Sequence, residues 1–259
     1  MATKGIRYGN KLVSLGGKGI RPGGPILDGL VFWVDPAHKQ SINETQIQLS
    51  SLVGTGRVLV NAENGPVFTN NNHFTYDGVN DRFYWTGVGD FSLSTDMSVS
   101  IWFKPVNHNQ GRQGLVARSN GLHEFNVTLE SFTKISFYFS VDPSAGFNGN
   151  YYNGASFQTF GTVDDEWQQA TFTRDLSQDD GVKIYRNGSL TSTGGTNGGS
   201  QQISTLGSIP VEPSKIFKIA DGNGGYFEGA IGQVLVYDRA LTSTEVLDNY
   251  NAEKYRYPN

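Results

Sequence analysis

Eleven glycine-containing dipeptides divide this chain into short segments, and this punctuation constrains the fold more than any other feature. Asn and Asp before Gly tolerate the positive φ values of type I′ turns, so these pairs favour tight connections between antiparallel strands. A chain punctuated in this way is predicted to consist largely of hairpins. The Asn-Gly pairs begin at Asn64, Asn120, Asn148, Asn153, Asn187, Asn197 and Asn223, and the Asp-Gly pairs at Asp28, Asp77, Asp180 and Asp221.

Between the turns lie short runs of β-branched and aromatic residues, which are typical of strands. In one run Val99, Ile101 and Phe103 face one way, whereas Ser98, Ser100 and Lys104 face the other. This pattern indicates an antiparallel sheet with one buried and one wet face. We predict an all-β fold, a two-sheet antiparallel jelly-roll sandwich. Its strands are expected at Leu30–Asp35, Arg57–Asn61, Arg82–Trp85, Ser98–Lys104, Gly114–Ala117, Glu124–Leu129, Lys134–Val141, Trp167–Arg174, Val182–Arg186, Ile216–Ala220 and Gly229–Tyr237.

One segment near the C-terminus has helical features instead. Thr242 and Glu245 fit a capping box, in which each side chain satisfies a free backbone N–H of the first helical turn. Val246, Leu247 and Tyr250 follow at helical spacing. The pattern predicts one short amphipathic helix over residues 243–254, with this apolar stripe against the sandwich.

The first 27 residues carry five cations and no acid, whereas the whole chain has a net charge of −4, so residues 28–259 carry −9. Glycine and proline make a helix unfavourable in this stretch. We interpret residues 1–27 as an extended basic arm and 28–259 as a single domain. The arm is either a frayed terminus or a segment that orders against an acidic neighbouring subunit. In the second case the partner-binding residues are Lys4, Arg7, Lys11, Lys18 and Arg21.

Composition excludes several classes of protein. The chain has no Cys, which excludes disulfide scaffolds, thiolate metal sites and a cysteine nucleophile. No apolar run is long enough to cross a membrane, and we see no secretory signal. A pI near 5.6 argues against nucleic acid as the partner of the whole chain.

Few residues in the sequence are candidates for catalysis or metal binding. The densest acidic cluster, Asp164-Asp165-Glu166, is expected to be a solvated turn, and the four His residues are scattered without metal-ligand spacing. We therefore predict no catalytic residues, no metal site and no cofactor. Calcium binding is the weaker alternative. The candidate is an oxygen-rich loop that contains Asp175, Ser177, Asp179 and Asp180.

An aromatic loop over residues 142–161 is harder to assign. Sugars bind where a flat ring stacks on C–H groups while amides bind hydroxyls, and a long loop on a rigid sandwich can supply both. The other interpretation is that these rings pin the loop to the core or to a neighbouring subunit. The candidate glycan- or interface-contacting residues are Phe147, Tyr151, Tyr152, Asn153 and Phe157, with Phe160 at the end of the loop.

Several segments together resemble the laminin-G-like, concanavalin A-like jelly-roll family. The resemblance covers residues 30 to the C-terminus and implies the same sandwich fold. It does not fix a function, because this fold serves lectins, glucanases, adhesion modules and virion proteins. The segments that carry it are Leu30–Asp35, Phe74–Asp81, Met97–Pro105, Glu166–Phe172, Val182–Gly188 and Phe227–Val246.

The resemblance, the basic arm and the lack of catalytic residues lead to our first hypothesis, a non-enzymatic structural protein of a virus particle. It would be a bacteriophage capsid-decorating or tail-associated subunit, made in the host cytoplasm and attached in many copies to other virion subunits. The alternative is a lectin-like carbohydrate-binding or adhesion module that uses loop 142–161 on a cell-surface glycan. A glycoside hydrolase or lyase is the third hypothesis. No nucleic acid or membrane is expected as a partner.

Overall fold

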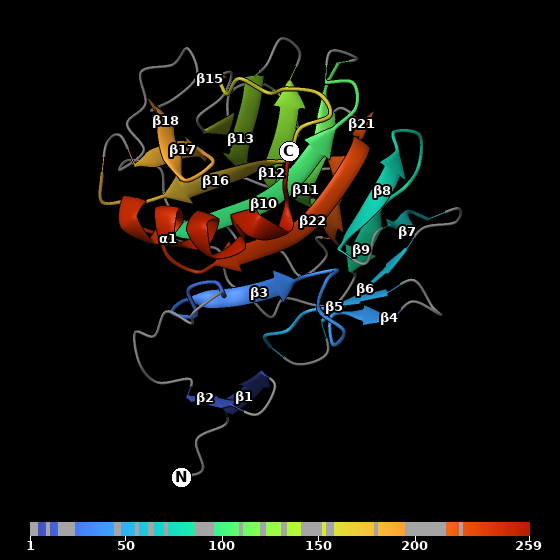
Figure 1. The fold of residues 1–259 in the computed structure, drawn as a ribbon. Coiled ribbons are helices and arrows are strands. Elements are labelled where there is room, and N and C mark those ends of the chain that lie inside the picture. Colours follow the sequence, from blue (N-terminus) through green and yellow to red (C-terminus); the bar gives the residue numbers. More distant parts are fainter. Residues whose placement is uncertain are drawn as a thin grey trace.

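The computed structural model describes residues 5–8, 11–14, 24–43, 48–54, 57–61, 65–69, 72–85, 96–108, 111–119, 123–130, 134–140, 152–153, 158–178, 181–194, 216–222 and 225–259. In this part of the chain two antiparallel sheets stack as a sandwich around one hydrophobic core, with a short α-helix near the C-terminus (Figure 1). The predicted fold class is confirmed.

The first sheet has eight strands and contains most of the long ones. Its strands are β3 (Leu30–Val34), β7 (Val67–Thr69), β8 (His73–Asp77), β10 (Met97–Pro105), β16 (Gln168–Arg174), β17 (Val182–Arg186), β18 (Ser189–Gly194) and β22 (Glu228–Tyr237). Their order is β18-β17-β16-β10-β22-β8-β7, and β3 also pairs with β22. Strand β22 therefore lies in the middle of the sheet, as its apolar residues on both faces predict.

The second sheet has ten strands, several of them only two or three residues long. They are β4 (Ile42–Asn43), β5 (Gln48–Ser50), β6 (Val58–Asn61), β9 (Phe83–Trp85), β11 (Gln113–Ser119), β12 (His123–Glu130), β13 (Lys134–Ser140), β14 (Tyr152–Asn153), β15 (Gln158–Thr159) and β19 (Ile216–Ile219). Their order is β14-β13-β12-β11-β19-β9-β6-β5-β4, with β15 also on β13. Each of the eleven predicted runs contains a strand.

Two small hairpins lie outside these sheets. Strands β1 (Gly5–Tyr8) and β2 (Lys11–Ser14) pair within the predicted arm, and β20 (Asp221–Gly222) pairs with β21 (Gly225–Tyr226). Ile26, two residues before the predicted domain boundary, is buried. Its N–H donates to Asn249 Oδ1 at 2.8 Å, and its carbonyl accepts from the Tyr237 hydroxyl at 3.1 Å.

The core lies between the two sheets. Val99, Ile101 and Phe103 of β10 are fully buried there, as the alternation predicts. From the opposite sheet, Phe137 of β13 packs on Phe172 of β16 with ring centroids 5.4 Å apart. These aromatic and β-branched side chains supply most of the apolar burial that stabilises the fold.

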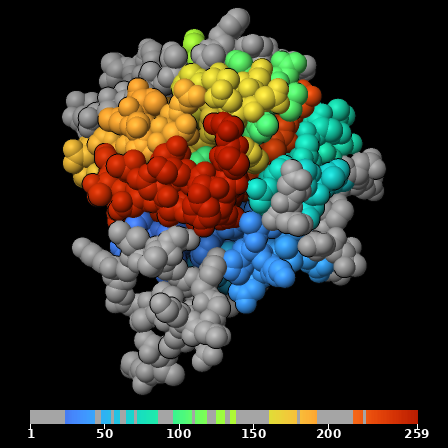
Figure 2. Space-filling model, viewed as in Figure 1, coloured from blue at the N-terminus to red at the C-terminus, as the bar shows by residue number. Residues whose placement is uncertain are grey.

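The outer face of the eight-stranded sheet is not wet, contrary to the prediction. Helix α1 (Ser243–Glu253), the 3₁₀ helix η2 (Lys254–Arg256) and the C-terminal residues lie across it (Figure 2). Ser98 and Ser100 of β10 are consequently buried. The Ser98 hydroxyl donates to the Arg239 carbonyl and accepts from Leu241 N–H, both at 2.9 Å, so its burial leaves no polar atom unsatisfied.

The helix is confirmed within one residue of its predicted end. Thr242 Oγ1 accepts from Glu245 N–H, and the Glu245 carboxylate accepts from Thr242 N–H, which completes the capping box. The buried stripe differs from the predicted one, because Leu247 is 43% exposed while Val246 and Asn249 are buried. Asn249 faces inward because its amide binds Ile26 and Tyr237.

Candidate functional site

A stacked aromatic cluster occupies the outer face of the eight-stranded sheet. Trp102 of β10 stacks on Tyr250 and Tyr257, with ring centroids 5.6 and 4.5 Å apart. The backbone N–H of Trp167 donates a hydrogen bond to Asn259 Oδ1. The chain's own C-terminus thus covers this face of the sheet.

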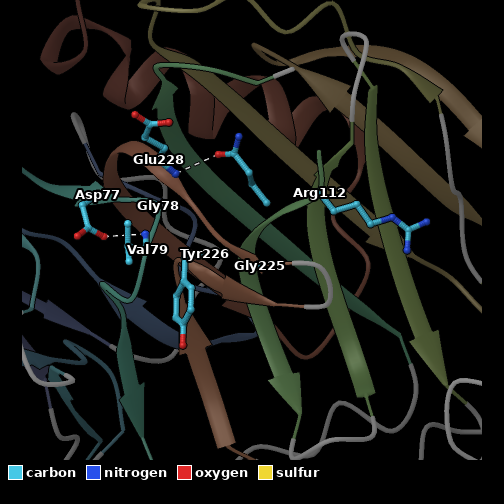
Figure 3. Close-up of a pocket in the computed structure, with 8 residues that line it drawn as sticks. Asp77, Gly78, Val79, Arg112, Gly225, Tyr226 and Glu228 are labelled. Carbon is cyan, nitrogen blue, oxygen red and sulfur yellow. Dashed lines mark hydrogen bonds between the residues drawn. The ribbon is translucent and has the colours of Figure 1, made fainter. Parts of the chain in front are cut away.

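A pocket of about 360 Å³ opens at one end of the sandwich, and its volume is within the size range of small-ligand sites. It lies where the turn after β8, the start of β11, the hairpin β20–β21 and the start of β22 meet (Figure 3). The segments that meet there are far apart in the sequence. The lining residues are Asp77, Gly78, Val79, Arg112, Gln113, Gly225, Tyr226 and Glu228.

A tight Asp-Gly turn forms one wall of the pocket. Asp77 Oδ1 accepts from the N–H groups of Val79 at 2.8 Å and Asn80 at 3.3 Å, and Gly78 has φ +76° (Figure 3). Chiefly because of the Val79 hydrogen bond, the pKa of Asp77 lies below its usual value. The carboxylate is therefore ionised at neutral pH, on an exposed turn whose tip, Val79, is 67% exposed.

Gln113 fixes the opposite wall. Its Oε1 accepts from Glu228 N–H at 3.0 Å, and its Nε2 donates to the Asn107 carbonyl at 2.7 Å. Glu228 is half-buried and is the direct cross-strand partner of Asp77, because β22 pairs with β8. Two acidic residues on paired strands thus line the pocket, and Figure 3 shows their carboxylates pointing in different directions.

The hairpin β20–β21 carries the aromatic ring of the site. Tyr226 is half-buried, with the guanidinium of Arg82 5.8 Å from its ring centroid. Asp221 of the same hairpin binds Arg82 Nη1 at 2.8 Å and Lys218 Nζ at 3.0 Å. Ion pairs and a cation–π contact therefore hold the ring in place.

Arg112 is the cation among the lining residues. Its Nε binds Glu130 Oε2 on β12 at 2.8 Å, and the Glu130 side chain is only 6% exposed. Figure 3 shows the guanidinium extending away from Asp77 and Tyr226. Together the pocket offers carboxylate acceptors, an amide and a phenolic ring, which are groups suited to a hydroxyl-rich ligand.

Asp77 is poorly suited to the general-acid role in bond cleavage. A glycosidase needs a general acid whose pKa is raised, facing a second carboxylate across the scissile bond. The pKa of Asp77 is shifted in the opposite direction, and its Oδ1 is engaged by the amides of its own turn. Asp164, in the acidic cluster, binds His108 Nδ1 at 2.7 Å, and Asp165 adopts φ +60°, so that cluster forms the predicted turn.

The residues predicted for partner binding are only partly described. Arg7 and Lys11 lie on β1 and β2, whereas Lys4, Lys18 and Arg21 lie outside the described residues. In the aromatic loop, Tyr152 and Asn153 form β14, which pairs with β13. Phe147, Tyr151 and Phe157, like Asp179 and Asp180 of the calcium alternative, lie outside the described part.

Phe160 ends the aromatic loop and is the member whose side chain can be placed. It is buried, with its ring centroid 6.0 Å from that of Phe103, and the Arg186 guanidinium lies 5.8 Å from its centroid. At this residue the loop is pinned to the core, which agrees with the second interpretation of its aromatics.

Sequence reasoning did not find the pocket. Asp77 and Gly78 are in a turn that the dipeptide pattern marks, but Arg112, Tyr226 and Glu228 stand in unrelated stretches. Only the strand order brings them together. Within the described ranges, no three His, Asp or Glu residues are grouped as metal ligands, and no helix is long and apolar enough to span a membrane.

Comparison with known proteins identifies the fold. A model of the Laminin_G_3 family, described as the concanavalin A-like lectin/glucanases superfamily, matches residues 76–247. No curated protein matches in sequence. The protein resembles the botulinum neurotoxin serotype D ligand-binding domain, solved with N-acetylneuraminic acid, at a TM-score of 0.64 and 14% identity over 87% of this chain and 51% of that one.

Two further structures are similar. The botulinum neurotoxin serotype G binding domain has a TM-score of 0.57 and 15% identity over 86% of this chain and 51% of that one. Trypanosoma rangeli sialidase, bound to a difluoro-KDN, has a TM-score of 0.56 and 13% identity over 89% and 34% of the two chains. The chain thus spans about half of the neurotoxin domains, and the likeness shows a shared fold.

The sequence match includes the Asp77 turn, the residues that line the pocket and the start of helix α1. The structural likeness agrees with it, and so does the resemblance seen in the sequence. Because the matched region is well over half of the chain, the protein belongs to the Laminin_G_3 family of the concanavalin A-like lectin/glucanase superfamily.

Proposed function

We propose that this protein is a non-enzymatic carbohydrate-binding module that holds a glycan in the pocket between Asp77, Gln113 and Tyr226. One observation supports this most directly: two carboxylates that can accept from hydroxyls, an amide and an aromatic ring line the same open pocket. Such a combination binds the hydroxyls and the C–H face of a sugar together.

The pocket is preorganised, which favours binding. Gln113 ties the start of β22 to the loop before β11, and the Asp77 turn is closed by its own hydrogen bonds. Groups that are already fixed lose little conformational entropy when a ligand arrives. The pocket also remains open, whereas the C-terminus covers the outer face of the eight-stranded sheet.

Glycan binding is favoured over the structural virion role. The similar structures named above include a ligand-binding domain in complex with a sugar and a sialidase in complex with another. The virion role relies on the basic arm, and three of its five cations lie outside the described residues. The role as a virion subunit stays a prediction. The glycan-binding proposal does not depend on it.

The test is a glycan array with the full chain, followed by titration calorimetry on the best ligand. We expect the variant Tyr226→Ala to bind at least tenfold more weakly than the unmodified protein. Tyr255→Ala, which removes a tyrosine that is 68% exposed on η2, is the matched control and should bind normally. Binding that survives Tyr226→Ala but is lost with Tyr152→Ala would move the site to loop 142–161.

A further inference from the structure

The charges around the pocket specify what kind of glycan it accepts, if the proposed function holds. The lining residues include two carboxylates, Asp77 and Glu228, and one cation, Arg112. A ligand therefore meets an excess of negative charge at the mouth of the pocket. A negatively charged sugar would need a cation near the pocket that is free to pair with it.

The described cations beside the pocket are already paired with protein carboxylates. Arg112 binds Glu130 at 2.8 Å, and Glu130 is almost fully buried. Arg82 and Lys218 both bind Asp221, at 2.8 and 3.0 Å. If Arg112 turned toward a ligand carboxylate, its ion pair with the buried Glu130 would break, which is unfavourable.

The carboxylates, in contrast, have no cationic partner among the described residues. Asp77 accepts backbone N–H groups, and the Glu228 side-chain carboxylate accepts no hydrogen bond within the described part of the chain. The two residues are direct cross-strand partners. Carboxylates without a cationic partner at the rim leave acceptor oxygens that the hydroxyls of a ligand can bind.

We infer that the pocket accepts an uncharged, hydroxyl-rich saccharide and excludes glycans that end in a carboxylate-bearing sugar such as a sialic acid. Sugar hydroxyls donate to Asp77 and Glu228 in hydrogen bonds strengthened by the negative charge of the acceptor. A ligand carboxylate offers no such donor and adds a third negative charge at the same edge. The inferred preference thus differs from the ligand of the similar neurotoxin domain, which was solved in complex with N-acetylneuraminic acid.

The experiment uses pairs of glycans that differ only in a terminal sialic acid, titrated against the full chain with EDTA present. We expect the uncharged member of each pair to bind at least tenfold more tightly at low salt. The difference should shrink at high salt, which screens exposed charges. Glu228→Gln keeps the shape of the side chain and removes its charge, so it should reduce the discrimination several-fold.

Asp238→Asn is the matched control, because it removes one exposed carboxylate at the opposite end of β22, roughly 30 Å away at the usual rise per residue. It should leave the discrimination unchanged. Equal or tighter binding of the sialylated glycans, still sensitive to Tyr226→Ala, would overturn this inference and leave the proposed function intact. Binding of neither member, or binding insensitive to Tyr226→Ala, would overturn the proposed function and this inference with it. Thermal melting of each variant separates lost binding from lost folding.

Discussion

Arg256 of η2 forms a two-pronged ion pair with Asp35 at the end of β3, so the last turn of the chain is fastened to the first strand of the sandwich. The same guanidinium also binds Glu253. Burial raises the pKa of Glu253 to about 6, so in the absence of its cation this carboxylate would resist ionising. Both acids are almost fully buried, and Arg256 is the cation that pairs with each of them.

Replacement of Arg256 should therefore destabilise the fold strongly. Arg256→Ala leaves Asp35 and Glu253 buried without their cation, and we expect it to lower the free energy of unfolding by about 3 kcal/mol. Urea unfolding followed by tryptophan fluorescence measures the change. Lys254→Ala, in the same turn, removes an exposed cation and should cost less than about 0.5 kcal/mol. Equal effects of the two variants would contradict the assigned role of Arg256.

The large-scale features of the fold could be predicted because they arise from local patterns. Alternation placed Val99, Ile101 and Phe103 in the core, and the Asn187-Gly188 pair forms the tight turn between β17 and β18 with φ values of +50° and +78°. The capping box at Thr242 located the start of the helix to the residue.

Features that depend on long-range packing could not be predicted in this way. Ser98 and Ser100 look solvent-facing in the sequence, yet they are buried because the C-terminal elements cover their face of the sheet. The pocket likewise depends on the pairing of β8 with β22 and on the position of the β20–β21 hairpin. Neither relationship leaves a local signature in the sequence.

A buried hydroxyl on β12 gives a second stability prediction. Thr128 Oγ1 is fully buried and makes no hydrogen bond to any residue that the structure describes. Thr128→Val removes this unsatisfied atom and keeps the shape, so it should leave stability unchanged or raise it by about 1 kcal/mol. In contrast, Thr171 Oγ1 donates to Ser100 Oγ at 2.9 Å, so Thr171→Val should lower stability by about 1 kcal/mol. Thermal denaturation of both variants checks the contrast, and a loss with Thr128→Val would indicate a bound water.

The capping box at the helix start gives a pH prediction. A hydrogen bond from Arg239 lowers the pKa of Glu245 to about 2, below the ordinary value of 4.5. A depressed folded-state pKa stabilises the protein above the unfolded value, and that stability is lost as the pH falls from about 5 towards 2. Glu245→Gln should thus reduce stability at pH 7 by about 2 kcal/mol and flatten the pH dependence in that window. Identical pH profiles for the two proteins would refute this assignment.

Gly114 of β11 allows the β20–β21 hairpin to lie close to β11. A Cβ at this position would lie 2.1 Å from the backbone nitrogen of Gly222, so β20 must approach β11 without an intervening side chain. Gly114→Ala should push the hairpin outward, displace Tyr226 and weaken glycan binding at least tenfold. Calorimetric titration, together with a melting curve that shows the protein folded, measures this effect. Undiminished affinity would place the ligand away from the hairpin.

Two N-terminal deletions should differ although both remove all five cations of the predicted arm. Among the described residues the β1–β2 hairpin pairs with no other strand, so deletion of residues 1–23 should leave the unfolding midpoint nearly unchanged. Deletion of residues 1–27 also removes Ile26, whose backbone binds Asn249 and Tyr237 and whose side chain is buried. We expect that loss to lower stability by about 2–4 kcal/mol. A similar midpoint for both deletions would mean that the domain begins at residue 28, as the sequence alone suggests.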